Sequence, residues 1–531
     1  MSASIDTQFA KASEEGAHAV LARKVFSFPA FLGVLLLAGT FMVLFANMET
    51  VTSDPSSASE FWLQGDTWWH LAIGRQILTA HSWPRVDIYS FTMRGAPWTA
   101  YEWLGEVVMA AAWRIGGLQA LMVLLTALAG AVVLLLFYYS YLRSRNATAA
   151  FLACAALLPL ASLSFTMRPQ IFGYVFLVMT LISLERFRQG HPKALWALPV
   201  IFLLWVNAHG TFALGFAILA IYFVSGFFSF HVRGLRAERW TPGQRRQLGI
   251  TILLCAVASV LTPYGAQLVA YYVELKCLAP VNLKVVTEWQ PFQLFNLSGV
   301  IFIASVLIFC FALLTSRLSC RLPDFALLVI ATTETLLHSR FILLFVPVFA
   351  PFLAEIFAGW VPKRQAARNY IIGNAVLMAC IGLGIIKFFP SKARLEEAVK
   401  LTAPVEAADF VRSHPRLGNT FTYYDWGSYL IFDLGSAHKV FMDGRLDLYE
   451  SGGVFQDYLT VLWTQPEAMA VLRKYNIRSC LILRGSTLGT LLAASPDWKQ
   501  VYHDNLSVLF VRNSANPLSQ RAAASVGTNS L

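Results

Sequence analysis

The sequence has little charge for its length. Only 13% of its 531 residues are Asp, Glu, Lys or Arg, whereas 57% are hydrophobic. A soluble protein carries about 25% charged residues, and the deficit here extends over most of the chain before residue 390. This excludes a soluble protein and also a soluble protein with a single anchor. The net charge is +11, but Lys and Arg stand mainly in short gaps between apolar runs, so we expect no nucleic-acid partner.

Cysteine motifs are also missing. The seven cysteines include no C-x-x-C pair, and most of them fall within apolar runs, where a thiol behaves as a small hydrophobic group. We therefore expect no structural disulfide, zinc site or redox motif. No convincing small-residue cleavage site follows the first apolar run, which predicts an uncleaved first helix.

Apolar runs long enough for transmembrane helices dominate the chain, since a helix crosses the hydrocarbon core in about 20 residues. The sequence predicts a polytopic α-helical membrane protein with about eleven spans. They lie near 28–48, 117–141, 148–165, 171–185, 195–208, 212–230, 248–263, 298–315, 323–338, 341–360 and 370–389.

Basic residues set the predicted orientation. With the N-terminal segment 1–27 in the cytoplasm, every cytoplasmic gap is basic, as in the run from Arg233 to Arg246. The transmembrane domain 28–389 then includes a large outer loop at 49–116, and the C-terminal segment lies outside. We expect a multi-pass protein of the bacterial inner membrane with a periplasmic C-terminal domain.

The segment 390–513 is typical of a small α/β domain. We expect a helix near 394–413 and a second helix at Gln465–Tyr475. The predicted strands are Asn419–Tyr424, Lys439–Asp443, Cys480–Arg484 and Ser507–Arg512. The tail 514–531 is small and polar, which predicts disorder.

The first outer loop contains the most informative polar residues. In the segment Gly65–Leu78, helical spacing places Asp66 and His70 on one face, and we expect this helix to lie in the membrane interface with Trp69 at headgroup level. Asp66 is either a helix N-cap or a general base or metal ligand. Glu102 and Glu106, one helical turn apart, either bind a cation or share a proton, or are solvated helix residues.

Further polar residues stand at outer membrane boundaries of five separate segments. Ionisable groups at membrane depth usually face a cavity or a polar partner, so the sequence predicts a shared cavity opening outward. A histidine at a helix end is more often structural, whereas Arg offers forked donors for phosphate oxygens. Asp87, in the first loop, is either a turn residue or a further cavity residue. The boundary candidates are Arg168, Gln170, Asn207, His209, Glu288, His338 and Arg340.

One helix, a large outer loop with an acidic residue, many spans and a small outer C-terminal domain resemble the GT-C superfamily of membrane glycosyltransferases. This superfamily includes protein mannosyltransferases, aminoarabinose transferases and oligosaccharyltransferase catalytic subunits. The runs Asp66–His70, Trp205–Gly210, Tyr424–Leu430 and Phe441–Arg445 are also similar to a group of bacterial proteins of this architecture.

The resemblance implies an inverting transfer of a sugar from a polyprenyl-phosphate donor to an outer acceptor, which could be a lipid, a glycan or a protein. It implies that Asp66 is the base, aided by His70 or Glu102, and that Arg168, Arg340 and His338 meet the donor phosphate. The family often has two acids adjacent or one apart, but Thr67 and Trp68 follow Asp66 here. A metal, if one is used, would be Mg²⁺ or Mn²⁺ held by Asp66 and Glu102.

Tyr424 and Asp425 are similar in pattern to the Trp-Trp-Asp-Tyr-Gly peptide-binding motif of oligosaccharyltransferases, although the aromatic residues are permuted. From the residues alone, a strand followed by a tight turn at Asp425 and Gly427 is the favoured interpretation, and Asp443-Gly444-Arg445 is likewise read as a strand end with a turn. Two other functions stay open. A transporter or flippase of lipid-linked sugars would use the same cavity, and an envelope-assembly scaffold would need no common cavity.

Overall fold

The computed structural model of the protein describes residues 23–53, 63, 65–232, 234–271, 285–315, 319–363, 370–415, 417–450 and 452–513. The predicted tail 514–531 and most of the predicted N-terminal segment 1–27 lie outside these residues. The chain divides into two compact units. Unit 1 comprises 1–47, 121–262 and 286–391, and unit 2 comprises 48–120, 263–285 and 392–531.

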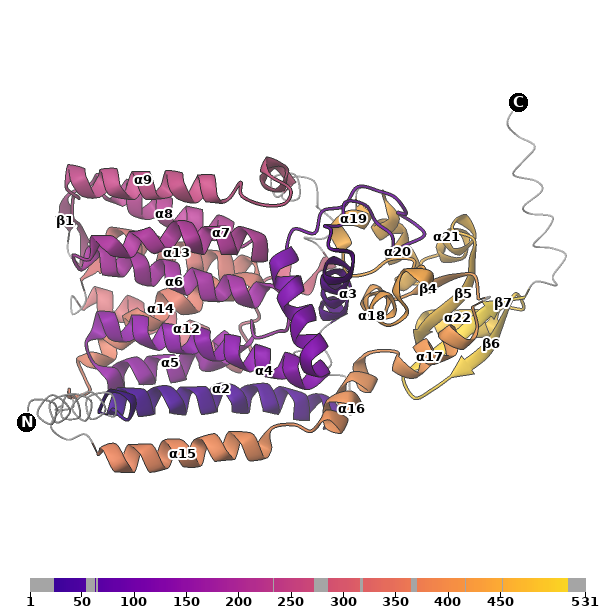
Figure 1. Ribbon diagram of the computed structural model, residues 1–531, viewed down its shortest axis with the longest axis horizontal. Coiled ribbons are helices and arrows are strands. Elements are labelled where there is room, and N and C mark those ends of the chain that lie inside the picture. The colour runs from indigo at the N-terminus through magenta and orange to yellow at the C-terminus, as the bar shows by residue number, and fades with distance from the viewer. Residues whose placement is uncertain are drawn as a thin grey trace, which may run out of the picture. The chain divides into compact units, whose positions relative to one another are not determined.

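Long apolar helices make up unit 1, and each of the eleven predicted spans coincides with a helix of the chain (Figure 1). Among the described residues, six helices are long and apolar enough to cross a membrane, and α5, α7 with its preceding turn, and α8 are shorter apolar helices. The chain is therefore a multi-pass helical membrane protein. The helices are α2 (Phe28–Ser53), α4 (Trp103–Ser144), α5 (Ala147–Ser162), α6 (Gln170–Arg188), α7 (Leu198–Ala208), α8 (Phe212–Ser225), α9 (Pro242–Ala258), α12 (Leu297–Leu314), α13 (Leu322–Leu337), α14 (Ile342–Ala358) and α15 (Ile371–Phe388).

Local sequence signals explain where several of these helices begin. Asn146 caps α5 by accepting hydrogen bonds from the backbone N–H groups of Thr148 and Ala149 at 3.1 and 3.2 Å. Thr241 and Gln244 form a reciprocal capping box at the start of α9. In α4 the helical backbone breaks at Gly116 and Gly117, close to the predicted start of its span.

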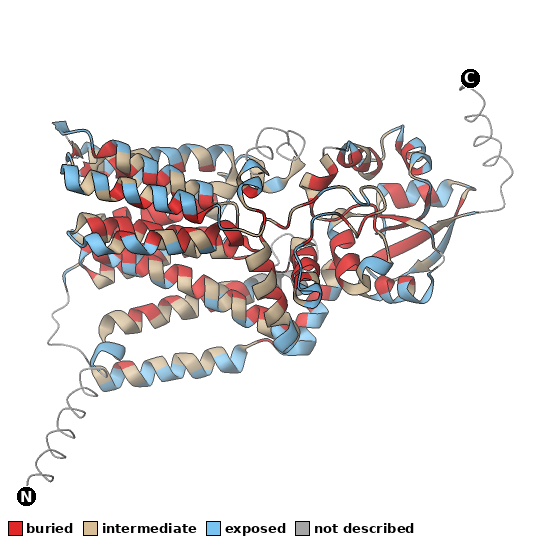
Figure 2. Cartoon of the chain, turned by 45° about the horizontal axis from the view of Figure 1, so that its top comes forward, coloured by how far each residue is buried: buried red, intermediate tan, exposed pale blue. Residues whose placement is uncertain are grey.

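Burial separates the inner helices of unit 1 from an outer one. In α14, every residue from Ile342 to Ala354 is buried, and this helix packs on α5. In α15 the only buried residue is Asn374, and its other residues are intermediate or exposed, as the colours of Figure 2 show. An exposed apolar surface on a long helix is what lipid contact requires.

A small sheet closes one end of unit 1. It has the order β1-β2-β3, with β1 (Phe230–Val232) antiparallel to β2 (Leu235–Ala237) and β2 parallel to β3 (Cys320–Arg321). Next to it, Asp324 and Glu355 form ion pairs with Arg143, at 3.2 and 2.8 Å. Their pairing satisfies charges that would otherwise be costly to bury.

Unit 2 contains a four-stranded mixed sheet with the order β4-β5-β7-β6. β4 (Asn419–Thr422) is parallel to β5 (Ile477–Leu483), whereas β7 (Ser507–Arg512) pairs antiparallel with β5 and with β6 (Trp498–His503). Its helices are α3 (Gly65–Ala80), α16 (Lys392–Thr402), α17 (Val405–Ser413), α18 (Tyr424–Leu434), α19 (Leu446–Glu450), α20 (Val454–Leu462), α21 (Ala468–Lys474) and α22 (Thr487–Ala494).

The structure corrects several predicted elements of the C-terminal segment. The single helix expected near 394–413 is two helices, because Pro404 interrupts it. Lys439–Asp443 is not a strand, since only isolated bridges from Val440 to Ser90 and Thr420 form there. The turn expected at Asp425 and Gly427 is the first part of α18, and β6 was not predicted.

Candidate functional site

The helix predicted around Asp66 is confirmed as α3, with Asp66 in its first turn. A carboxylate there is stabilised by the partial positive charge of the helix N-terminus. Trp69 Nε1 donates a hydrogen bond to Asp66 Oδ1 at 3.1 Å, which fixes the carboxylate against an indole ring. Asp66 itself is half-buried.

Protein side chains bury the two tryptophans of α3. Trp68 and Trp69 are only 3% and 4% exposed, because the helix packs against α18. The Trp68 ring meets Tyr429 edge-on, with centroids 5.0 Å apart, and also contacts Phe432. The tryptophans therefore pack within unit 2, and the predicted position of this helix in the membrane interface stays a prediction.

Two glycines allow other residues to approach the start of α3. A Cβ atom at Gly444 would overlap Asp66 Oδ1 and the Trp69 ring, and a Cβ atom at Gly65 would overlap the Asp425 carboxylate. The structure thus brings the Asp425 and Gly444 segments to Asp66, although these segments are far away in sequence. Tyr424 begins α18 next to Asp425, and its backbone N–H donates to Tyr458.

His70 lies between Glu102 and Glu106, the two glutamates that are one helical turn apart in the sequence. Its Nδ1 is 3.1 Å from Glu106 Oε1, and its Nε2 is 3.6 Å from Glu102 Oε2. All three residues are buried. Glu106 Oε2 is buried without a hydrogen-bond partner among the described residues. A histidine whose two ring nitrogens both face carboxylates can share and relay a proton. This cluster therefore has a capacity for proton transfer that two solvated glutamates lack.

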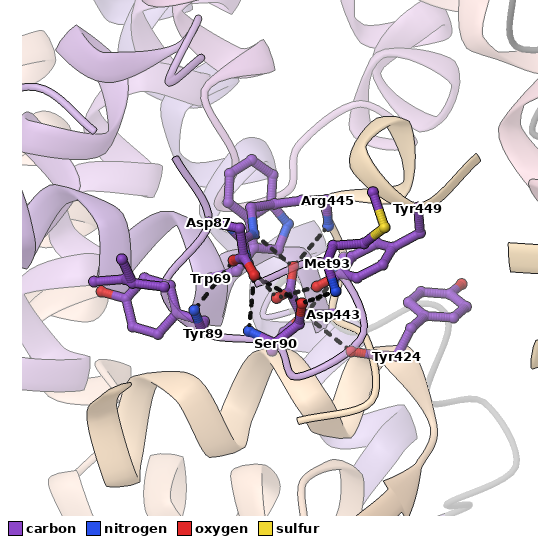
Figure 3. A network of polar contacts seen from close by, with 12 residues as sticks. Trp69, Asp87, Tyr89, Ser90, Met93, Tyr424, Asp443, Arg445 and Tyr449 are labelled. Carbon is purple, nitrogen blue, oxygen red and sulfur yellow. Dashed lines mark hydrogen bonds and ion pairs between the residues drawn. The ribbon is translucent and has the colours of Figure 1, made fainter. Parts of the chain in front are cut away.

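Asp87 belongs to a second buried network, which Figure 3 shows. Arg445 donates to both oxygens of Asp443 at 2.8 and 2.7 Å, and to Asp87 Oδ1 at 2.6 Å. Asp87 also accepts from the backbone N–H groups of Tyr89 and Ser90 and from the Ser90 hydroxyl. These contacts are those of a turn residue tied to a cation, whereas the predicted cavity role of Asp87 stays a prediction.

Arg445 was not predicted as a partner of Asp87, because the two residues are 358 positions apart. The side chain is 1% exposed and stacks over Trp98, with its guanidinium carbon 4.8 Å from the ring centroid. Burial lowers the pKa of Arg445, but Asp443, Tyr449 and Asp87 together outweigh that effect and raise the pKa well above its ordinary value. The guanidinium is therefore a permanent cation that links the first outer loop to the segment after β4.

In unit 1, residues from four of the five predicted polar boundaries come together. Arg168 donates to Glu288 Oε1, and Arg340 Nη1 forms an ion pair with Glu288 Oε2 at 3.2 Å. Arg340 also lies over the Trp289 ring, 5.5 Å from its centroid. Burial raises the pKa of Glu288, but Arg168 and Arg340 outweigh it and lower the pKa to about 2. One carboxylate thus serves two arginines.

His209 completes this cluster, with its Nε2 3.4 Å from Arg340 Nη2. A guanidinium has no acceptor, so in this contact Nε2 of the neutral ring accepts from Arg340. The other ring nitrogen, Nδ1, lies 3.0 Å from the Thr211 hydroxyl oxygen. Burial lowers the pKa of His209, and Arg340 and Arg168 lower it further. His209 is therefore a neutral ring beside two cationic arginines.

The remaining boundary candidates have mainly structural contacts. His338 Nδ1 lies 2.8 Å from the Trp289 carbonyl oxygen, and Asn207 Nδ2 donates to the carbonyl oxygens of Leu203 and Leu261. Gln170 is buried, and its Oε1 has no hydrogen-bond partner in the part of the chain that the structure describes.

Within the described ranges, no group of three or more His, Cys, Asp or Glu residues is arranged to hold a metal ion. The predicted use of Asp66 and Glu102 as ligands of Mg²⁺ or Mn²⁺ stays a prediction. Such a site would require ligands beyond these two, since both ions prefer several oxygen ligands.

No family model and no curated protein matches the sequence. Among solved structures, the chain is similar to the oligosaccharyltransferase AglB from Archaeoglobus fulgidus in complex with an inhibitory peptide and a dolichol-phosphate, with TM-score 0.47 and 12% identity over 85% of this chain and 69% of that chain. It is also similar to ArnT from Cupriavidus metallidurans bound to undecaprenyl phosphate, with TM-score 0.45 and 14% identity over 91% of this chain and 98% of that chain. Both similarities extend over most of this chain.

Proposed function

We propose that the protein is a membrane glycosyltransferase that transfers a sugar from a polyprenyl-phosphate donor to an acceptor outside the cytoplasm. The observation that carries this proposal is the cluster in which Arg168 and Arg340 present donors to one carboxylate, that of Glu288, with neutral His209 beside Arg340. Donor groups of this kind bind a phosphate as they bind a carboxylate, and the planar fork of Arg suits both. Glu288 would then occupy the position of the donor phosphate when no donor is bound.

The position of the cluster in the fold agrees with a lipid-linked donor. Arg168 lies just before the candidate membrane span Gln170–Arg188, and Arg340 lies at the start of the candidate span Ser339–Ala358. The polyprenyl tail of a donor would contact apolar helix surfaces, while its phosphate would meet charged donors at the membrane boundary.

The acceptor would be activated by unit 2. Asp66 would take the proton of an acceptor hydroxyl as that oxygen forms a bond to the anomeric carbon of the sugar. The bond between the anomeric carbon and the phosphate oxygen breaks in the same step, and the lipid phosphate leaves with the electron pair. Because phosphate is a good leaving group, the protein contributes mainly positioning and charge stabilisation. Trp69 would orient Asp66, and His70 with Glu102 would adjust the local charge.

A binding experiment tests the donor half of the proposal. Purified protein would be titrated with undecaprenyl phosphate, and we expect Arg340→Gln to weaken binding at least roughly tenfold, because a charge-assisted contact to phosphate is worth about 1.5–3 kcal/mol. Arg145→Gln is the matched control, since Arg145 is exposed and pairs only with Gln189 among the described residues. Equal binding by Arg340→Gln and the control would refute the phosphate role of Arg340.

A transfer experiment tests the acceptor half. In membranes supplied with a polyprenyl-phosphate sugar, Asp66→Asn should abolish transfer while undecaprenyl phosphate still binds, because the amide cannot accept the acceptor proton. Full transfer by a folded Asp66→Asn protein would exclude Asp66 as the base.

A further inference from the structure

A second group of arginines surrounds a cavity in unit 1 that the proposed transfer reaction does not use. The cavity has a volume of about 120 Å³, and its polar lining includes Arg188, Arg236, Arg239, Arg321, Trp240 and Gln244. One water molecule needs roughly 10–15 Å³ of such volume, so the cavity can hold a headgroup-sized polar ligand.

The location of this cavity separates it from the Arg168–Glu288–Arg340 cluster. Arg188 ends α6, whereas Arg168 lies just before the start of the same helix. The 19 residues of α6 rise about 28 Å, which is close to the thickness of the hydrocarbon core. The cavity therefore lies at the opposite membrane boundary, which the distribution of basic residues predicts to be the cytoplasmic one.

Two of the arginines are held from one side and so are fixed in place. Arg321 Nη1 donates to Glu185 Oε2 at 3.0 Å, and Arg188 Nη1 lies 3.5 Å from Asp324 Oδ1. In both side chains, the polar contacts within the described residues involve Nη1 alone. The other guanidinium donors of these two residues are thus available to a ligand in the cavity.

The other polar groups also present donors rather than acceptors. Gln244 Oε1 accepts from the backbone N–H and the hydroxyl of Thr241, which leaves the Nε2 donors of its amide for the cavity. Arg236 Nε is buried without a hydrogen-bond partner in the described residues, and the Glu238 carboxylate is 3.8 Å away. Glu238 is the single acidic residue among the lining residues, against four arginines. The lining therefore selects an anion.

Aromatic residues near the cavity indicate that its anion is the headgroup of a lipid rather than a soluble phosphate. Trp240 packs on Phe187, with ring centroids 5.0 Å apart, and forms part of the cavity lining. Directly after α8, beside the lining residue Ser225, Phe227, Phe228 and Phe230 are exposed. Exposed aromatic residues next to basic ones, at the end of a spanning helix, are typical of the membrane interface.

We propose that this cavity binds the phosphate of an anionic phospholipid headgroup, with Arg236 and Arg239 as its adjustable contacts and Arg188 and Arg321 as its fixed ones. A soluble phosphate would satisfy the same donors but would not use the exposed apolar rim. The site requires no transfer reaction and is independent of the function proposed above.

Native mass spectrometry of the full-length protein in detergent can test the proposal, with phosphatidylglycerol, phosphatidylcholine and inorganic phosphate as probes. We expect one phosphatidylglycerol to bind at least roughly tenfold more tightly than phosphatidylcholine. The double variant Arg236→Gln/Arg239→Gln should remove that preference, since each basic residue near an anionic lipid contributes measurably. Arg188 and Arg321 are left intact because their pairs with Asp324 and Glu185 support the fold.

The control is Arg145→Gln/Arg246→Gln, which removes the same charge from exposed positions outside the lining. It should retain the preference within about twofold of the unaltered protein, which is small beside the tenfold effect expected of the lining arginines. Equal affinity for the two lipids, or equal losses in both double variants, would overturn the proposal. Displacement of phosphatidylglycerol by millimolar inorganic phosphate would overturn the lipid assignment.

Discussion

Replacing Arg445 by Met should destabilise unit 2 more than the replacement of any exposed charged residue. The Met side chain fills a similar volume but leaves the carboxylates of Asp443 and Asp87 without their cation. Asp443 keeps only the Tyr449 hydroxyl and the backbone N–H of residue 445 as donors among the described residues, whereas Asp87 keeps three donors of its own turn. Removing one partner of a buried ion pair costs about 3–5 kcal/mol.

Thermal unfolding in detergent measures this effect. A loss of about 3–5 kcal/mol lowers the Tm of a unit of this size by roughly 6–20 °C. Arg412→Met is the control, because Arg412 pairs with Asp409 and Asp433 while its own side chain is 49% exposed, and exposed pairs contribute about 0–1 kcal/mol. The triple variant with Asp87→Asn and Asp443→Asn should recover part of the loss, since it removes the unpaired charges. Similar Tm values for Arg445→Met and Arg412→Met would refute the reasoning.

Two further results are expected. The pKa of Glu288 is lowered from 4.5 to about 2, so its ionised form stabilises the fold above pH 4.5, by about 3 kcal/mol at most, and this contribution is lost as the pH falls toward 2. The Tm difference between the protein and Glu288→Gln should therefore narrow between pH 6 and pH 3, and a constant difference would contradict the pairing. Gly444→Ala should reduce transfer at least roughly tenfold by pushing Asp66 and Trp69 apart, whereas Gly384→Ala, in open space on α15, should not; equal activities would show that the contact is unimportant.

The spanning helices could be predicted because the membrane imposes a length and a composition that short sequence windows record. All eleven predicted spans coincide with helices, although several of those helices are shorter than a full span. The C-terminal elements were harder to predict. Lys439–Asp443 has the apolar composition of a strand, but Val440 bonds to two separate segments rather than to a continuous neighbour. Pairing of that kind depends on tertiary contacts that a local pattern does not contain.

Part of the candidate site could likewise be predicted from the sequence, and part of it could not. The proximity of Glu102 and Glu106 follows from helical spacing, whereas the position of His70 between them depends on the packing of α3 against α4 residues 36 positions away. The proximity of Arg168, His209 and Arg340 could be predicted, because the sequence places all three residues at the same side of the membrane. That Glu288 would be the shared partner of the two arginines could not be predicted, since the loop carrying it has no periodic pattern.

Arginines near the two ends of α6 form ion pairs that differ in how far their side chains are buried. This difference decides which carboxylate a ligand could replace. At one end Arg143 pairs with Asp324 and Glu355, and the Arg143 and Asp324 side chains are only 4% and 2% exposed. A closed and balanced network of this kind is structural, because exchanging a partner would strand a buried charge. At the other end Arg340 and Glu288 are 26% and 28% exposed.

In the proposed donor complex, the Glu288 side chain would move toward water as a phosphate takes its place, so that neither the arginines nor the displaced carboxylate would be left buried without a partner. Exchange of one anion for another is energetically accessible there, since the desolvation cost of the arginines has already been met in the folded protein. The same exchange at Asp324 would leave a carboxylate in the interior. Hence Asp324→Asn should destabilise the protein without a selective loss of undecaprenyl phosphate binding, whereas Glu288→Gln should strengthen that binding by removing a competing anion. Weaker binding in Glu288→Gln, measured in the same titration at neutral pH, would exclude the exchange.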